Sequence, residues 1–470
     1  MTTAAMDDSS HMSFHVLDTV APVLAPRVGK LAIAGRRTLS TPHYISLTSR
    51  GTVPHITHDV MRDHTGINGL YAGLEDFIEK KPPAPLYKTP VTEQESPLKK
   101  FICVPENMPL ILGPRRFPAI PCPPTNTETS IAVLTSVGFH QLSAHHYVEA
   151  VQKLRPDIAI GLADIVLGKP PGVKRREKMV DRTHAFTRDA LDRLYEDPEE
   201  GQPKSKAAYF APVLPLDNTQ QSLYLDDLES EFRHNLSGLA LYESASLTFI
   251  PESLGSLPRL LLSNPSSPHE ILREISLGAD LLTVPLLGAS SDAGVALDFD
   301  FPVPPALQTA RSEPKPLGFD LWSSDNVTDT SPLREGCECH ACQQHHRAYL
   351  HHLLSAKEMT AWALIQIHNH HIMELFFAGI GESIQRGSFD EDVQVFNRVY
   401  AASLPEQTGQ GPRLRGHHLP AAGPGQPRRM PRIYGRLDEA IQKFAESQSS
   451  VATPDTGAEG LEEHGFAEKA

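Results

Sequence analysis

Short apolar runs alternate with amphipathic segments from about residue 130 onward. The apolar runs have the length of buried strands, and the segments between them repeat their apolar residues with a helical period. The predicted strands cover 131–137, 158–162, 209–214, 239–242, 259–262 and 279–285, and the predicted helices cover 143–154, 175–196, 223–234 and 268–277. Repeated strand–helix units occur in barrels and in doubly wound sheets. We favour an α/β fold with a (β/α)8 TIM-type barrel.

The helix at 268–277 has the clearest start signal in the chain. Ser267 stands at the N-cap position, Pro268 at the first helical position and Glu270 three residues after the cap. This order is typical of a capping box, in which the serine and the glutamate each satisfy a backbone N–H group at the helix start.

The pattern divides the chain into five parts. Alternating segments such as 30–34 and 44–47 predict strands ahead of the barrel, and long helical stretches at 343–386 and 389–401 follow it. We expect a disordered leader at 1–12, an N-terminal β-rich segment leading into the barrel at 13–130, the barrel at 131–336 with a Pro/Ser-rich excursion at 288–335, a zinc-binding subdomain with C-terminal helices at 337–402, and a low-complexity, disordered tail at 403–470 with one short helix at 436–446.

Composition and charge narrow the class of protein. The chain has 470 residues and a formal net charge of −14, so binding of nucleic acid must depend on a local basic patch. Two patches exist, at 169–178 and 413–436, and a solvated loop or tail explains each equally simply, above all the second. No apolar run is long enough to span a bilayer, and the N-terminus lacks the pattern of a signal peptide. We therefore expect a soluble intracellular protein.

Three of the five cysteines, Cys337, Cys339 and Cys342, lie within six residues. Such a cluster is typical of a metal site in a reducing compartment, and thiolates with a histidine suit one tetrahedral zinc ion. Four protein ligands leave no open position, so the zinc would be structural. Spacing alone leaves the fourth ligand open among the downstream histidines, of which His368 is best placed to reach back from an apolar helix. The candidates are His340, His345, His346, His351, His352, His368, His370 and His371.

Residues 337–382 resemble the zinc-binding subdomain of the tRNA-guanine transglycosylases. The matching text is CECHAC at 337–342, RAYLHHL at 347–353 and IHN at 367–369. The family has the same interval between its third cysteine and the histidine of IHN, so the resemblance implies His368 as the fourth ligand. It also implies a (β/α)8 barrel with an inserted zinc subdomain, in agreement with the strand–helix pattern. With gaps, the resemblance extends over about residues 14–402, and its N-terminal part, around 48–58, is similar to the family's eukaryotic accessory subunit.

The residues that perform the family's reaction are replaced or missing in this chain. The resemblance implies that an aspartate attacks the ribose and that a deazapurine, queuine, replaces guanine at wobble position 34 of tRNAs with GUN anticodons. Catalytic members end the relevant strand in D-x-x-D, whereas this chain has Asp280-Leu-Leu-Thr283, with Thr283 in the nucleophile's place. No D-S-G-G-F-Q stretch occurs between 100 and 140, and the glycine pair is reduced to Ser237-Gly238. Asp164 matches a base-recognising aspartate or is a polar residue at a strand end.

The resemblance therefore implies an accessory subunit with no catalytic residues of its own. Its partners would be the catalytic subunit, in a heterodimer, and tRNA bound through that complex. Its location would be the cytoplasm, with association at the mitochondrial outer surface. Two alternatives stay open: an active transglycosylase with a displaced carboxylate, Asp280 or Asp292, and an unrelated zinc-stapled barrel that binds another partner.

Overall fold

A closed barrel of parallel strands forms the centre of the computed structural model. The model describes residues 11–17, 24–78, 84–122, 126–135, 138–168, 170–196, 204–308, 313–409 and 411–412. Around the barrel the strands are β4 (His43–Leu47), β5 (Leu70–Gly73), β6 (Leu110–Gly113), β9 (Ile158–Ile160), β10 (Ala208–Val213), β11 (Gly238–Leu241), β12 (Arg259–Leu261) and β13 (Leu281–Thr283), and β13 closes on β4. The predicted α/β barrel is confirmed.

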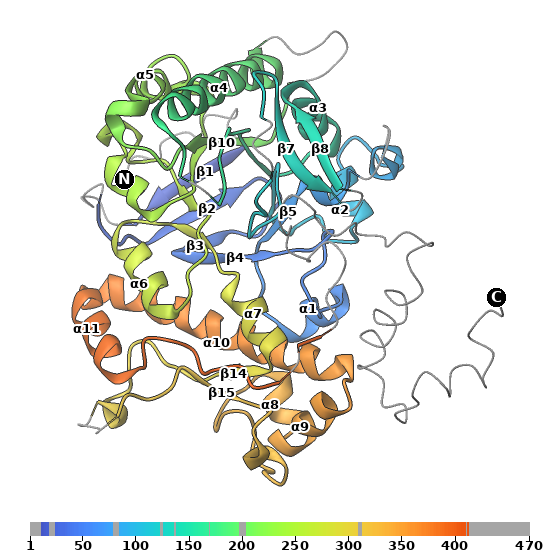
Figure 1. Cartoon of the computed structure of the whole chain (residues 1–470), viewed down its shortest axis with the longest axis vertical. Helices are drawn as coiled ribbons and strands as arrows, with labels where there is room; N and C mark the ends of the chain where they lie inside the picture. The colour runs from blue at the N-terminus through green and yellow to red at the C-terminus, as the bar shows by residue number, and fades with distance from the viewer. Residues whose placement is uncertain are drawn as a thin grey trace, which may run out of the picture.

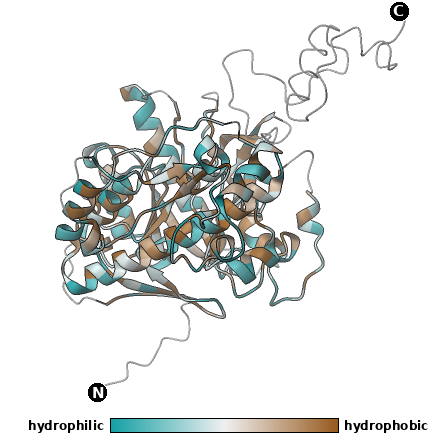
Figure 2. Cartoon of the chain, turned by 90° about the horizontal axis from the view of Figure 1, so that it is seen from below, coloured by the Kyte–Doolittle hydropathy of each residue, from teal (hydrophilic) through white to brown (hydrophobic). Residues whose placement is uncertain are grey.

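Side chains alternate between the two faces of the barrel wall, as they must in strands. Ile45, Tyr71 and Ile111 point into the barrel interior, whereas Tyr44 belongs to the cluster between the strands and the outer helices. An antiparallel sheet of β1 (Met12–Val16), β2 (Gly29–Ile33) and β3 (Leu39–Thr41) adds apolar residues to the interior cluster and so covers one end of the barrel. Figure 2 shows hydrophobic strands in the middle of the molecule, with helices of mixed hydropathy around them.

The barrel begins earlier in the chain than the sequence pattern indicated. Strands β4, β5 and β6 lie within 13–130, and the run predicted at 131–137 is β7 (Ser130–Thr135), which pairs with β8 (Gly138–Ser143) in a separate hairpin. The expectation that the barrel occupies only 131–336 was therefore wrong. The first helices are short, α1 (His58–His64) and α2 (Pro97–Phe101), so the strand–helix alternation is weak there.

The predicted helices of the barrel lie within a few residues of the observed ones. These are α3 (Ala144–Leu154), α4 (Val173–Leu191), α5 (Asn218–Glu229) and α6 (Pro268–Ser276). Ser267 is the N-cap of α6 with Pro268 at its start, but the Ser267 side chain makes no capping bond. The Glu270 carboxylate accepts a hydrogen bond from Ser266 N at 2.6 Å, one residue before the cap, so the predicted capping box is replaced by this single bond.

The C-terminal elements pack beneath the barrel, on the side opposite α4 (Figure 1). They are α7 (Leu286–Ala293), β14 (Val295–Leu297), β15 (Gly318–Asp320), α8 (His340–Gln344), α9 (Arg347–Ser355), α10 (Met359–Arg386) and α11 (Phe389–Val399). The predicted helix at 343–386 is thus divided among α8, α9 and α10, with Lys357 at a left-handed φ of 57° before α10. The excursion at 288–335 contributes β14, which lies against α10, and β15, which pairs with β14.

Some predictions fall on residues that the structure does not describe. These are residues 1–10 of the expected leader, the tail helix at 436–446 and the basic run at 413–436. Met12, the last residue of the expected leader, already belongs to β1. Among the described helices, none combines the length and the apolar character needed to cross a membrane.

Candidate metal centre and barrel mouth

Four ligand atoms converge between the loop before α8 and the middle of α10. The sulfurs of Cys337, Cys339 and Cys342 and a ring nitrogen of His368 all lie within 4.8 Å of one another. His368 Nδ1 is 3.7, 3.5 and 3.4 Å from the three sulfurs in that order. A tetrahedral zinc ion with ordinary bond lengths would hold sulfur and nitrogen about 3.5 Å apart. The group therefore fits one metal ion without rearrangement.

The start of α8 positions the thiols. Cys339 is the N-cap of α8, and its sulfur accepts a hydrogen bond from Cys342 N at 3.4 Å. The capping geometry turns both sulfurs to the same side, and Cys337 reaches the same point from the preceding loop. Cys339 and Cys342 are buried and Cys337 is half-buried, so water has little access to an ion held here.

His368 is oriented by a bond from its other ring nitrogen. The ring is fully buried, and Nε2 lies 2.9 Å from Leu297 O on β14, so Nε2 carries the proton and Nδ1 faces the thiols. Burial lowers the pKa of His368, but hydrogen bonding with Cys337 and Cys342 outweighs burial and raises the pKa to about 9 in the metal-free group. The converging group contains none of the other candidate histidines, all of which are described. His370, for example, contacts Tyr44 and Gln366 instead.

Thr283 and Asp280 lie at opposite ends of β13. Thr283 is buried at the C-terminal end of the strand, and its hydroxyl donates to Ser263 O at 2.8 Å. A hydroxyl bound to a backbone carbonyl has no base to activate it. Asp280 is buried at the other end, where Arg27 donates to both carboxylate oxygens at 2.8 and 2.5 Å and Arg259 N donates at 2.8 Å. Barrel enzymes have their active sites at the C-terminal ends of the strands, and Asp280 lies at the N-terminal end. The idea that Asp280 is a displaced nucleophile is therefore wrong.

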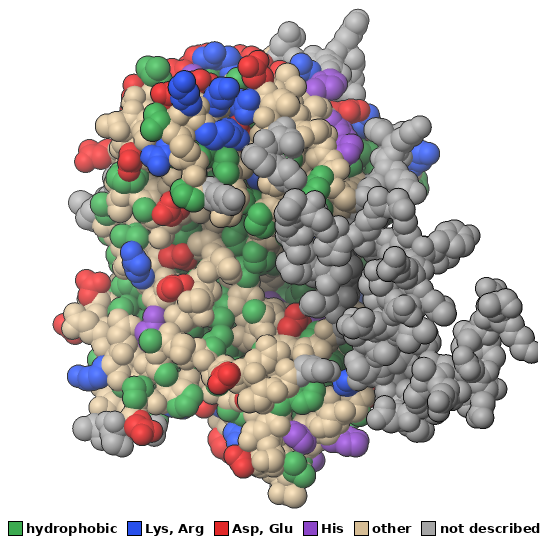
Figure 3. All heavy atoms as spheres, in the orientation of Figure 1, with side chains coloured by type: hydrophobic (Ala, Val, Ile, Leu, Met, Phe, Trp, Pro, Cys, Tyr) green, Lys and Arg blue, Asp and Glu red, His purple; other side chains and the backbone are tan. Residues whose placement is uncertain are grey.

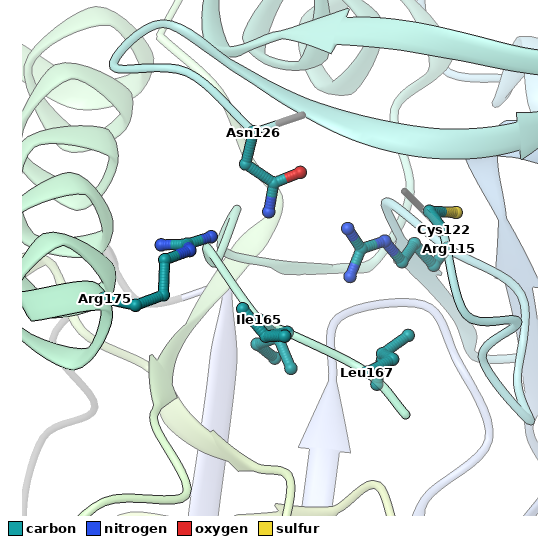
Figure 4. Close-up of a pocket in the computed structure, with 7 residues that line it drawn as sticks. Arg115, Cys122, Asn126, Ile165, Leu167 and Arg175 are labelled. Carbon is teal, nitrogen blue, oxygen red and sulfur yellow. The ribbon is translucent and has the colours of Figure 1, made fainter. Parts of the chain in front are cut away.

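Asp164 lies just after β9 and is enclosed by donors. Its carboxylate accepts hydrogen bonds from Arg175 at 2.7 and 2.5 Å, from Arg182 at 3.0 Å and from Asn126 at 2.5 Å. Burial raises the pKa of Asp164, but these donors lower it by more. Arg115, Arg175 and Asn126 point into the space beside it from separate elements (Figure 4), and that cavity measures only about 10 Å³. This volume is about that of one water probe, so base recognition by Asp164 stays a prediction.

A larger cavity of about 460 Å³ occupies the mouth of the barrel. Its wall includes Arg115, Tyr242, Ser263 and Glu274, which follow barrel strands or lie on the helix behind them. Glu274 was not among the predicted site residues. It is buried, Ser263 Oγ donates to it at 2.8 Å, and burial raises the pKa of Glu274 to about 7. Its place on the apolar face of the predicted helix at 268–277 was the available signal.

Replacing Glu274 with glutamine should remove part of the pH dependence of stability. The folded-state pKa of about 7 is above the ordinary value of 4.5, so the native protein loses stability as pH rises from about 4.5 through 7. We expect a loss on the order of 2–3 kcal/mol in the native chain across this range. The Glu274→Gln variant should not show this loss of stability with rising pH. Urea denaturation at several pH values measures the effect, and equal pH profiles for the two proteins would contradict the assignment.

A family model described as queuine tRNA-ribosyltransferase matches residues 24–402, which include every barrel strand and the four clustered ligand residues. The chain belongs to the queuine tRNA-ribosyltransferase family. Within this family it is 37% identical, over 84% of its length and 86% of the relative's, to the queuine tRNA-ribosyltransferase accessory subunit 2 of Schizosaccharomyces pombe. It is 29% identical to the protein of the same name from Drosophila pseudoobscura, over 79% of this chain and 89% of that one. The Gallus gallus protein of that name is 25% identical over 78% of this chain and 93% of its own.

Proposed function

We propose that this chain is the non-catalytic subunit of a heterodimeric queuine tRNA-ribosyltransferase, and that it supports the exchange of guanine for queuine at the wobble position of tRNA. One observation carries the proposal: the metal group is complete, whereas the nucleophile position is Thr283, a buried hydroxyl bound to Ser263 O. The shared name of the relatives, accessory subunit 2, supports the same reading.

Zinc is the metal that the ligand chemistry favours. Three thiolates and one imidazole are soft to borderline donors, and four protein ligands in a closed shell are typical of structural zinc. The ion would join the loop before α8 to α10, and through the bond from His368 to Leu297 it would also hold β14. In this proposal, residues 337–402 are a zinc-binding subdomain that shapes a surface and performs no chemistry.

The partner would be the catalytic subunit, bound on the side of the zinc-binding subdomain. Large apolar side chains are exposed there: Tyr349 on α9 is 38% exposed, Met359 on α10 is 55% exposed and Val327 nearby is 53% exposed. Exposed large apolar side chains are frequent at protein interfaces. We place the complex in the cytoplasm, peripheral to the mitochondrial outer membrane, which cell fractionation would test.

Exchange of labelled guanine into tRNA tests the proposal directly. We expect no exchange by the purified chain, and exchange when it is co-expressed with the catalytic subunit. Thr283→Val in this chain should leave the activity of the complex unchanged. The other displaced-carboxylate candidate, Asp292, lies on α7 with His55 Nε2 at 2.6 Å from its Oδ1. Exchange by the isolated chain that is lost in Asp292→Asn would overturn the accessory role.

A basic surface on α4 is the predicted contact with tRNA. Lys and Arg side chains gather at the top of the molecule, where α4 lies (Figure 3). Arg175 and Arg182 are occupied by Asp164, whereas Lys174 and Lys178 are exposed at the same end of the helix.

Charge reversal at both lysines, Lys174→Glu with Lys178→Glu, should weaken tRNA binding by the heterodimer about tenfold or more at low salt. The slope of the logarithm of the binding constant against the logarithm of the salt concentration should also become less steep, by the amount expected for the loss of about two phosphate contacts. The matched control is Lys30→Glu, an exposed lysine on β2, in the sheet that covers one barrel end. Filter binding across a salt series measures both quantities. Equal losses in the control and the α4 variant would show a general charge effect and contradict a local contact.

A further inference from the structure

A second cavity lies between the barrel wall and the helices beneath it. It measures about 350 Å³ and is bordered by the end of β4, by α7 and by α10. Phe117, Pro118 and Asn264 line this cavity and the mouth cavity, and so form the boundary between the two. Most of its wall is apolar, with Leu47 and Leu287 among the lining residues. None of the roles proposed above uses it.

Two buried polar groups of the wall have hydrogen-bonding capacity left over. Ser46 and Gln366 are each 2% exposed; the Ser46 hydroxyl lies close to the Tyr44 hydroxyl, and Gln366 Oε1 has no hydrogen-bond partner among the described residues. Gln366 Nε2 pairs with His370 Nε2 at 3.1 Å, and His370 Nδ1 pairs with Tyr44 Oη at 3.0 Å. Whichever way the amide is turned, one polar atom meets His370 and the other is left over. Such groups are rare in native proteins because each costs free energy unless water or a ligand satisfies it.

Gly288 keeps part of this cavity open. It lies on α7 and lines the cavity, and a Cβ built there would meet no heavy atom within 4 Å. Glycine is unfavourable inside a helix, and no close contact requires one at this position. A larger side chain would therefore extend into empty space and not into the wall.

The charges of the wall disfavour an anionic occupant. Among the described residues no lysine or arginine lines the cavity, and its carboxylate, Asp292, is 44% exposed and bound to His55. An anion would lose its hydration with no cation to replace it. The Gln366 amide and the Ser46 hydroxyl both line the cavity and offer hydrogen-bonding atoms to an occupant of its apolar wall.

We propose that this cavity binds a small uncharged molecule with an apolar body and an amide-like edge. Gln366 and Ser46 would pair with the edge, and the apolar residues of β4 and α7 would enclose the body. Because Gln366 lies on the same helix as His368, occupancy would stabilise the contact between the barrel and the helix that carries the metal ligand. The proposal does not depend on the proposed function.

Three probes of one shape and different charge test the proposal on the full chain in its metal-loaded form. They are benzamide, which is neutral, benzoate, which is anionic, and benzamidine, which is cationic. We expect benzamide to bind measurably by saturation-transfer NMR and calorimetry, and benzoate to bind at least about tenfold more weakly because its charge would be buried unpaired. Benzamidine binding as tight as benzamide would overturn the preference for an uncharged edge.

Three variants locate the binding. Gly288→Leu should abolish benzamide binding by filling the cavity, and Ser46→Ala and Gln366→Leu should each weaken it several-fold by removing one hydrogen-bonding group. The control is Gly381→Leu, a helical glycine of α10 that also meets open space but does not line the cavity. Metal content and thermal melts show that each variant folds. No binding by any probe, equal binding of benzoate and benzamide, or benzamide binding that survives Gly288→Leu would each overturn the proposal.

Discussion

Cys339→Ser should release the metal and cost the protein much of the stability of its C-terminal third. Cys339 is both a proposed ligand and the N-cap of α8, and a serine hydroxyl is a far weaker zinc ligand than a thiolate. Structural zinc contributes on the order of 10–16 kcal/mol to the folding of small domains. Here the barrel would stay folded, since its core does not depend on the ion, and the loss would fall on α8, α9 and the contact with β14.

Elemental analysis of the purified variant measures the metal, and hydrogen exchange locates the loss. We expect close to one zinc per native chain, little in the variant, and faster exchange in α8 and α9. Pairing with the catalytic subunit should weaken in the same variant. The control is Cys103→Ser, an exposed cysteine outside the metal group. Full pairing after complete metal loss would contradict a role for the ion in shaping the partner surface.

Asp280→Ala should be the most destabilising single change within the barrel. The carboxylate is fully buried and pairs with Arg27, which is 4% exposed, while Arg259 beside it is also fully buried. Burial already lowers the pKa of the Arg259 guanidinium to about 10. Without Asp280, the buried guanidinium groups of Arg27 and Arg259 would lose the carboxylate between them and retain backbone carbonyl acceptors, and the expected loss is about 3–5 kcal/mol.

Urea denaturation measures this loss, and Asp63→Ala is its control. Asp63 forms an ion pair with Arg62 on the surface of α1, where solvent screens the charges, so little change is expected. Urea denaturation together with an assay of exchange by the heterodimer distinguishes a structural from a catalytic role of Asp280. A variant with native stability and a heterodimer that has lost exchange activity would point to catalysis and contradict the structural role.

The degree to which the sequence predicted the site differs among its residues. The spacing of Cys337, Cys339 and Cys342 was informative because thiols on one tight turn can converge whatever the rest of the fold does. His368 could not be chosen by spacing, because a histidine on a long helix faces one of several directions. The family resemblance selected it, and the bond from Leu297 O on β14 gives the physical reason. Glu274 went unpredicted although its place on the apolar face of the predicted helix at 268–277 was a signal of burial. The cavity beside Gln366 went unpredicted because elements distant in the sequence form it together.

The sequence by itself indicated repeated strand–helix units and a group of three cysteines suited to a metal ion, because both depend on residue type and on short spacings along the chain. The family resemblance, and not spacing, placed Thr283 where a nucleophile would be needed. Only the tertiary structure decided where the barrel begins, that Asp280 is structural, and that Asp164 is enclosed by arginines. These depend on contacts between distant residues, such as Arg27 with Asp280 across 253 positions. Local sequence patterns do not indicate such pairs, because burial and charge pairing between distant residues arise only when the chain folds.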